Sequence, residues 1–303
     1  MAWTVADIPA QDGRLAVVTG PTGLGYEVGL ALARAGAEIV LAGRSPGPAA
    51  QSLDRIRAQV PGARVRFETL DLASLVAVES FANKLLAESR AIDILVNNAG
   101  VMMPPERKTT RDGFELQIGT NYLGHFALTA RLLPLLRKGR ARVVNVASIA
   151  ANAPAAINFD DLQWERSYSP GASYGQSKLA MILFGRELQR RSAAQNWGIT
   201  SIPAHPGVAA TDLIDKGPGA QSALGRLSRL LPFLRQSAAR GALPLLEAAT
   251  DPSALPGGYY GPDGFRGMRG APKLVEPPRN ARDEATARRL WDVSERLTKV
   301  RWE

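Results

Sequence analysis

The fold is decided by the stretch LAVVTGPTGLG, residues 15–25, which joins a short apolar run to a glycine-rich turn and then to the start of a helical pattern. The glycines let the backbone turn tightly and approach a pyrophosphate, and a helix start offers unpaired amides and a positive dipole end. A turn of this kind gains weight only inside a repeated strand–helix pattern. The residues of this turn that we expect to bind a dinucleotide are Gly20, Thr22, Gly23, Leu24 and Gly25.

The rest of the chain supplies that repeated pattern. The expected strands are Leu15–Thr19, Glu38–Ala42, Val65–Thr69, Ile94–Asn97, Val143–Ala147 and Thr200–Ala204. The expected helices are Leu24–Ala35, Ser74–Ser89, Phe114–Arg137, Ser173–Arg191 and a last one that begins near Asn280 and is capped by Asp283. The strands alternate with helices, so the sequence predicts an α/β protein with a doubly wound parallel sheet, a Rossmann fold of about seven strands with helices on both faces.

We found no linker or internal repeat that would divide the chain, so we expect one domain over residues 1–303. Within it, a segment at about 207–240 is expected to cover the substrate, and a helix at about 281–299 to pack on the body through Leu290, Val293 and Leu297.

The composition excludes several classes of site. The 303 residues contain no cysteine and two histidines, so we expect neither disulfides nor a metal centre. No apolar run is long enough to span a bilayer and no signal peptide is recognisable, so we expect a cytoplasmic protein. The net charge of +9 is spread along the chain rather than gathered in a block. That distribution argues against a nucleic-acid partner and favours an anionic cofactor.

The second expected strand leads into Ala42-Gly43-Arg44-Ser45. A site for NAD usually has an acidic side chain here, on the ribose 2′-hydroxyl, whereas Arg44 offers a guanidinium that can pair with a 2′-phosphate. A plain surface arginine is the alternative. The missing acid and the present base both favour NADP over NAD.

Tyr174 and Lys178 stand four residues apart at the start of a helical pattern, which places them on one helical face. A neighbouring ammonium favours the phenolate, so Tyr174 could exchange the proton that accompanies hydride transfer. Ser148 follows an apolar strand, at the end where ligands bind in open α/β sheets, and its hydroxyl could hold the substrate oxygen. Each signal alone is weak, but their order along the chain is specific.

With these motifs in place, the chain resembles the single-domain short-chain dehydrogenase/reductase family over nearly its whole length. The resemblance implies a catalytic tetrad, in which Asn121 holds a water, Ser148 orients the substrate, Tyr174 is the general acid/base, and Lys178 binds the nicotinamide ribose and lowers the Tyr174 pKa. It also implies cofactor contacts beyond the turn and Arg44. Those contacts are Asp71, Leu72, Asn98, Ala99, Gly100, Tyr174, Lys178, Pro206, Gly207, Val208 and Thr211.

Asp160-Asp161-Leu162 and the stretch 174–184 are similar to retinol-dehydrogenase-like NADP reductases. The implied function is an NADP(H)-dependent oxidoreductase that interconverts a carbonyl compound and an alcohol, with an apolar small-molecule substrate. The alternatives are a non-catalytic NADP sensor of the same fold and, less favoured, a sugar epimerase or dehydratase. The family pattern is TGxxxGxG, and this chain is one residue short between its first two glycines, which brings cofactor affinity into question.

Several residues have competing interpretations. His125 follows Asn121 by one turn and could face the site, although helix packing is the favoured role; Met102 and Met103 could border the substrate or fill the core. The apolar and basic segment 213–234 is read as a mobile lid, with a membrane-surface helix as the less favoured alternative. The family resemblance also implies a homodimer or homotetramer through the helices of Asn121 and Tyr174, unless the basic C-terminal segment blocks that face.

Overall fold

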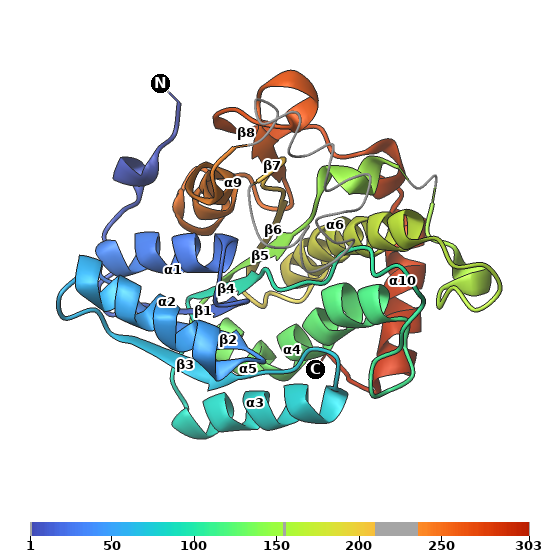
Figure 1. The fold of residues 1–303 in the computed structure, drawn as a ribbon, viewed down its shortest axis with the longest axis horizontal. Helices are drawn as coiled ribbons and strands as arrows, with labels where there is room; N and C mark the ends of the chain where they lie inside the picture. The colour runs from blue at the N-terminus through green and yellow to red at the C-terminus, as the bar shows by residue number, and fades with distance from the viewer. Residues whose placement is uncertain (1, 154–155, 210–235, 303) are drawn as a thin grey trace.

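The computed structural model describes residues 2–153, 156–209 and 236–302. Its centre is a single eight-stranded sheet with the order β3-β2-β1-β4-β5-β6-β7-β8 (Figure 1). The strands are β1 (Leu15–Thr19), β2 (Glu38–Gly43), β3 (Val65–Thr69), β4 (Ile94–Asn97), β5 (Arg142–Val146), β6 (Thr200–Ala204), β7 (Tyr259–Pro262) and β8 (Pro272–Val275).

The strand order reverses beside β1, which pairs in parallel with β2 on one side and with β4 on the other. Connections leave in opposite directions at this point, so a crevice opens at the carboxyl ends of β1 and β4. Thr19 pairs with Ala42, and Asn97 pairs with Asn145, so the ends of neighbouring strands lie level. Residues that follow these strands therefore meet at one edge of the sheet.

Alternate residues of each strand point to opposite faces and build two cores. The face that contains Ala16 and Val18 packs on α1 (Leu24–Arg34), α2 (Pro46–Gln59) and α9 (Ala238–Thr250). The face that contains Leu15 and Val17 packs on α3 (Leu75–Glu88), η2 (Ile118–Leu123), α4 (Gly124–Arg131), α5 (Leu133–Lys138), α6 (Pro170–Ala194) and α10 (Glu284–Thr298). The short turns are η1 (Val5–Asp7), η3 (Ile149–Asn152), η4 (Phe159–Asp161), η6 (Phe265–Gly267) and η7 (Arg279–Ala281).

The predicted doubly wound sheet is confirmed, with one strand more than expected. All six expected strands form, within one residue at each end. The strands β7 and β8 were not predicted. The edge strand β8 runs antiparallel to β7, begins with Pro272 and exposes Lys273 and Leu274, so it lacks the apolar run that identified the buried strands.

The prediction of one helix over Phe114–Arg137 is wrong. The segment contains a wide π-helical turn, η2, followed by α4 and then α5. Pro134 has no N–H to donate to the preceding turn, so α4 ends at Arg131 and a new helix begins. The π-helical turn places Asn121, and it has no signature in apolar periodicity.

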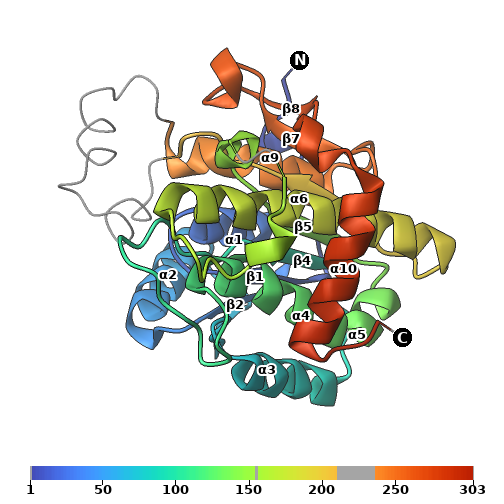
Figure 2. The ribbon, with the colours of Figure 1, turned by 90° about the vertical axis from the view of Figure 1, so that its right-hand side faces the viewer.

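The C-terminal helix is confirmed in position: α10 has Asp283 as its N-cap, whose side chain accepts from the amide of Ala285. It lies across α4 and α6 (Figure 2). Its Trp291 packs against Phe126 of α4 and Phe184 of α6, with ring centroids 5.1 and 5.9 Å away. Subunits were expected to associate through these two helices. The side of α4 and α6 that carries Phe126 and Phe184 is, however, covered by α10 of the same chain.

Most of the expected substrate-covering segment, 210–235, lies outside the described residues, and so does Thr211. In the described part of the chain, no helix combines the length and the apolar character needed to cross a bilayer.

Candidate active site

In the turn after β1, two glycines lie so near neighbouring atoms that a side chain at either position would clash. Gly20 has φ +82°, and a Cβ there would lie 2.9 Å from Nδ2 of Asn98. A Cβ on Gly25 would lie 1.8 Å from the carbonyl oxygen of Gly20, so only glycine lets α1 start this close to the turn. The turn that is one residue short thus forms a tight connection, with Gly23 (φ 56°) immediately before the first residue of α1.

A cleft of about 450 Å³ opens above this turn. It brings together most of the predicted site residues from seven parts of the chain. Those that line it are Gly20, Thr22, Gly23, Leu24, Arg44, Leu72, Asn98, Ala99, Gly100, Ser148, Tyr174, Lys178, Pro206, Gly207 and Val208.

Of the predicted residues that the structure describes, three lie outside this lining. Gly25 packs against the backbone of Gly20 within the turn. The carboxylate of Asp71 accepts from the amide of Ala73 at 3.1 Å, while its neighbours Leu70 and Leu72 face the cleft. Asn121 is fully buried behind the wall.

Asn121 supports the segment that follows β4. Its side-chain oxygen accepts from the amide of Val101 at 2.8 Å, and its Nδ2 donates to the Val101 carbonyl at 3.0 Å and to Oγ of Ser177 at 2.9 Å. A Cβ on Gly100 would lie 3.0 Å from Oδ1 of Asn121 and 3.7 Å from Nζ of Lys178. Asn121 therefore connects the cleft wall to the helix that carries Tyr174 and Lys178.

Tyr174 and Lys178 come from the first half of α6, and both are buried, with 6% and 4% of their surfaces exposed. Burial raises the pKa of Tyr174 to about 12, and a hydrogen bond with Ser148 opposes that rise. Burial also lowers the pKa of Lys178 to about 8. Nζ of Lys178 donates to the Val146 carbonyl at 2.9 Å and lies 6.0 Å from the Tyr174 ring, and desolvation is the dominant influence on the Tyr174 pKa here. The expected lowering of that pKa by Lys178 stays a prediction.

Arg44 lies exposed on the rim of the cleft, next to Ser45. No described residue of the lining is acidic, and Arg44 and Lys178 are its charged members. Arg44 forms no ion pair with any carboxylate of the described chain, so its guanidinium is available to an anionic group.

Some lining residues were not predicted, including Ser45, Leu70, Ile149 and Ala150. The most informative is Thr120, which is 6% exposed and whose Oγ1 has no hydrogen-bond partner within the described residues. Its place directly before Asn121 is the one signal that could have found it. The hydroxyl oxygen itself is buried, so Thr120 is a wall residue and its hydroxyl is not placed to bind a ligand in the cleft.

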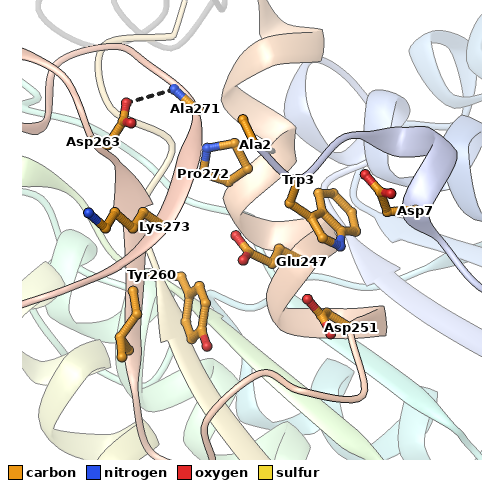
Figure 3. A pocket seen from close by; sticks show the side chains of 11 residues that line it. Ala2, Trp3, Asp7, Glu247, Asp251, Tyr260, Asp263, Ala271, Pro272 and Lys273 are labelled. Atoms are coloured by element: carbon orange, nitrogen blue, oxygen red, sulfur yellow. Dashed lines mark hydrogen bonds between the residues drawn. The ribbon is translucent and has the colours of Figure 1, made fainter.

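A second hollow of about 720 Å³ lies between the N-terminal segment, α9 and the β7–β8 pair (Figure 3). Trp3, Glu247, Asp251 and Tyr260 line it, and the carboxylate of Asp263 accepts from the amide of Ala271 at 2.9 Å. None of the predicted site residues borders this hollow. The cleft at the carboxyl ends of the strands is therefore the candidate active site.

Comparisons with known proteins agree with this geometry. The family model described as short chain dehydrogenase matches residues 14–218. Human retinol dehydrogenase 13 is 40% identical over 293 residues, which cover 94% of this chain and 84% of that protein. Mouse polyprenol dehydrogenase is 41% identical over 298 residues, which cover 96% and 85% of the two chains.

Among solved structures, an uncharacterised protein from Mycobacterium paratuberculosis superposes with a TM-score of 0.81 at 36% identity, and the match covers 100% of both chains. The family model and the relatives, which align over most of their length, point to the same assignment. This chain therefore belongs to the short-chain dehydrogenase family of nicotinamide-dependent oxidoreductases.

Proposed function

We propose that this protein is an NADP(H)-dependent oxidoreductase that interconverts an apolar carbonyl compound and its alcohol. The observation that carries the proposal is the convergence of Ser148, Tyr174 and Lys178 with the glycine turn and Arg44 around one cleft. The bound dinucleotide would supply or accept the hydride. The protein's part is to orient the substrate and to move one proton.

Tyr174 is suited to donate that proton during carbonyl reduction. A phenol with a pKa near 12 is protonated at neutral pH, and its hydrogen bond with Ser148 places two hydroxyls where a substrate oxygen could be held. Lys178, with a pKa near 8, is mostly cationic at pH 7. An ammonium beside the phenol opposes the build-up of negative charge as the proton leaves. We expect reduction to slow above about pH 8, as Lys178 loses its charge.

The preference for NADP is supported by charge. The exposed guanidinium of Arg44 follows β2, and the described lining has no carboxylate that would repel a 2′-phosphate.

The apolar substrate is supported by the rest of the lining. Val101, Met102, Met103, Ile149 and Val208 border the cleft near the polar groups. Thioether and aliphatic side chains of this kind accommodate an apolar ligand of variable shape. The names of the relatives, retinol and polyprenol dehydrogenase, make isoprenoid alcohols and aldehydes the first substrates to test.

The test is a kinetic screen of the full chain with NADPH and NADH against isoprenoid and shorter aldehydes, ketones and alcohols. We expect NADPH to give the higher kcat/KM, and Arg44→Ala to cut the NADPH-to-NADH ratio by about 10- to 100-fold, the usual strength of a charged hydrogen bond. Arg64→Ala, which removes an exposed arginine before β3, is the matched control and should leave the ratio unchanged.

The same screen tests the proton donor. Tyr174→Phe should fold normally, bind NADPH and lose at least about 100-fold in kcat. A Phe variant with wild-type turnover, or a wild type that prefers NADH, would contradict the proposal. Nucleotide binding without turnover on any substrate would favour the sensor instead.

A further inference from the structure

A hydrogen-bonded chain runs behind the cleft and passes through His125 of α4. This residue is fully buried and does not line the cleft. Its Nδ1 lies 2.9 Å from the backbone carbonyl oxygen of Asn121, and its Nε2 lies 2.9 Å from Oγ1 of Thr19 at the end of β1. Helix packing, the role favoured by the sequence, uses neither ring nitrogen, whereas here both are engaged.

The partners determine which nitrogen carries the proton. Oγ1 of Thr19 accepts from the amides of Asn98 and Ala99, both at 2.9 Å, which uses both lone pairs and leaves its hydrogen to donate. The carbonyl of Asn121 can only accept, so Nδ1 of His125 must be the protonated nitrogen. Nε2 is then free to accept from Thr19, at 2.9 Å against 3.3 Å for the alternative acceptor, the Val96 carbonyl.

The ring stays neutral in this setting. Burial and the charge of Lys178 lower the pKa of His125 to about 3. In a cationic ring Nε2 would also carry a proton. It could then no longer accept the hydrogen bond from the Thr19 hydroxyl, and two donors would face each other. The neutral Nδ1–H form satisfies every group in the chain of contacts.

The two ends of this series of hydrogen bonds lie in the two halves of the candidate site. Thr19 holds the amides of Asn98 and Ala99, which line the cleft beside the glycine turn. Asn121 holds Val101 and Ser177, next to Lys178. His125 is a direct side-chain link between the half that would bind the dinucleotide and the half that would move the proton.

We propose that His125, as its neutral Nδ1–H tautomer, is a positioning residue that sets the spacing between the turn after β1 and the Asn121–Lys178 side of the cleft. It acts through Thr19 and Asn121, and it touches no reacting atom. The inference rests on the proposed function and adds to it a residue that should control cofactor affinity and turnover together.

The kinetic test uses His125→Leu, which removes both contacts, and two half variants. In His125→Asn the side-chain amide can still reach the Asn121 carbonyl, and in His125→Gln its oxygen can still accept from Thr19. We expect the Leu variant to raise the NADPH Kd and to lower kcat, each by about tenfold, and the half variants to fall between it and the wild type. Because the ring does not titrate near neutrality, the shape of the pH–rate profile should stay unchanged.

Tyr122→Phe is the matched control. Tyr122 stands next to Asn121 in η2 and is also buried, and the Phe variant loses one hydrogen bond, to Ser294 of α10. It should lose stability but keep the wild-type Kd and kcat. If His125→Leu behaves like Tyr122→Phe, His125 is merely structural and the proposal is wrong; a changed pH profile would instead make it a proton carrier.

A measurement on the protein without nucleotide separates this proposal from the proposed function. The chain has two histidines, and His205 accepts from the amide of Gly207 through Nδ1 at 3.3 Å, so it should be the Nε2–H form. A ¹⁵N spectrum of histidine-labelled protein should therefore show one ring of each tautomer, with the Nδ1–H signals lost in His125→Asn. Two Nε2–H rings would overturn the His125 assignment, whereas failure of NADPH to bind would overturn only the function.

Discussion

A buried ammonium destabilises the folded state, and Lys178 is the clearest case in this protein. Its pKa is lowered from 10.5 to about 8, so below pH 8 the folded state holds a charge that the unfolded chain carries more easily. Lys178→Met should therefore be inactive yet more stable at pH 7 by about 1–3 kcal/mol, after allowance for the lost bond to Val146. The gain should shrink as pH rises above 8, because the native lysine then becomes neutral.

Chemical unfolding of both proteins at pH 7 and pH 9.5 checks this prediction. Lys84→Met is the control, since Lys84 is exposed and paired with Glu68, and such surface pairs contribute little. A Lys178→Met protein that is less stable than wild type at pH 7 would show that the Val146 contact outweighs desolvation.

Glu247 gives the opposite pH dependence. Burial, followed by the nearby charge of Asp251 one turn along α9, raises its pKa from 4.5 to about 7. A carboxyl with a raised pKa favours the fold below its unfolded pKa and progressively less as pH rises to 7. Glu247→Gln should therefore match wild type near pH 4.5 and exceed it at pH 8, by about 1 kcal/mol once solvent screening of this partly exposed residue is allowed for. Thermal melts across that range test it, and equal Tm values at pH 8 would contradict it.

Residue spacing predicted which side chains meet at the cleft better than it predicted their pKa values. Tyr174, Lys178, Ser148 and Arg44 were found by spacing and by their place after strands, and the structure brings all four to one cleft. The raised pKa of Tyr174 could not be predicted, because it depends on how completely distant segments exclude water from the ring. The hydrogen bond between His125 and Thr19 could not be predicted either, because the two residues are 106 positions apart in sequence.

At the scale of elements, the junction between β1 and α1 depends on Gly25. Because a Cβ would overlap the Gly20 carbonyl, Gly25→Ala must push α1 away from the turn. We expect a loss of about 2–3 kcal/mol in stability and a large rise in the NADPH Kd. Gly171→Ala, in the first turn of α6 with open space around its Cα, should instead stabilise by up to about 1 kcal/mol. Unfolding curves and NADPH titrations of the two variants check both, and a Gly25→Ala protein with wild-type affinity would refute the first.

Elements were predictable where one local rule dominated. The strands that are buried on both faces were predicted from continuous apolar runs, and α10 was predicted from its N-cap residue and an apolar stripe. Prediction failed where local rules conflicted. Phe114–Arg137 is periodic enough for one helix, yet Pro134 and the π-helical turn divide it, and α9 contains Pro244, which disguises a genuine helix.

At the scale of the whole molecule, α10 completes the core. Trp291 is among the largest fully buried side chains and touches Phe126, Phe184 and Trp302. Trp291→Ala should cost about 3–5 kcal/mol and expose apolar surface on α4 and α6. Denaturant unfolding measures the loss, and size-exclusion chromatography should show new self-association of the variant. Arg288→Ala, on the exposed side of α10, is the control and should change stability by less than about 0.5 kcal/mol. A loss as small as that of the control would contradict the role given to Trp291.

The charged and proline-bearing outer strands have a further consequence for how the protein behaves at high concentration. At one border of the sheet, β8 begins with Pro272, which has no amide hydrogen, and exposes Lys273. At the other, β3 carries Arg66 and Glu68, which are engaged with Glu88 and Lys84. An incoming chain would have to bury these charges in order to add a strand, so the open sheet resists growing into fibrils.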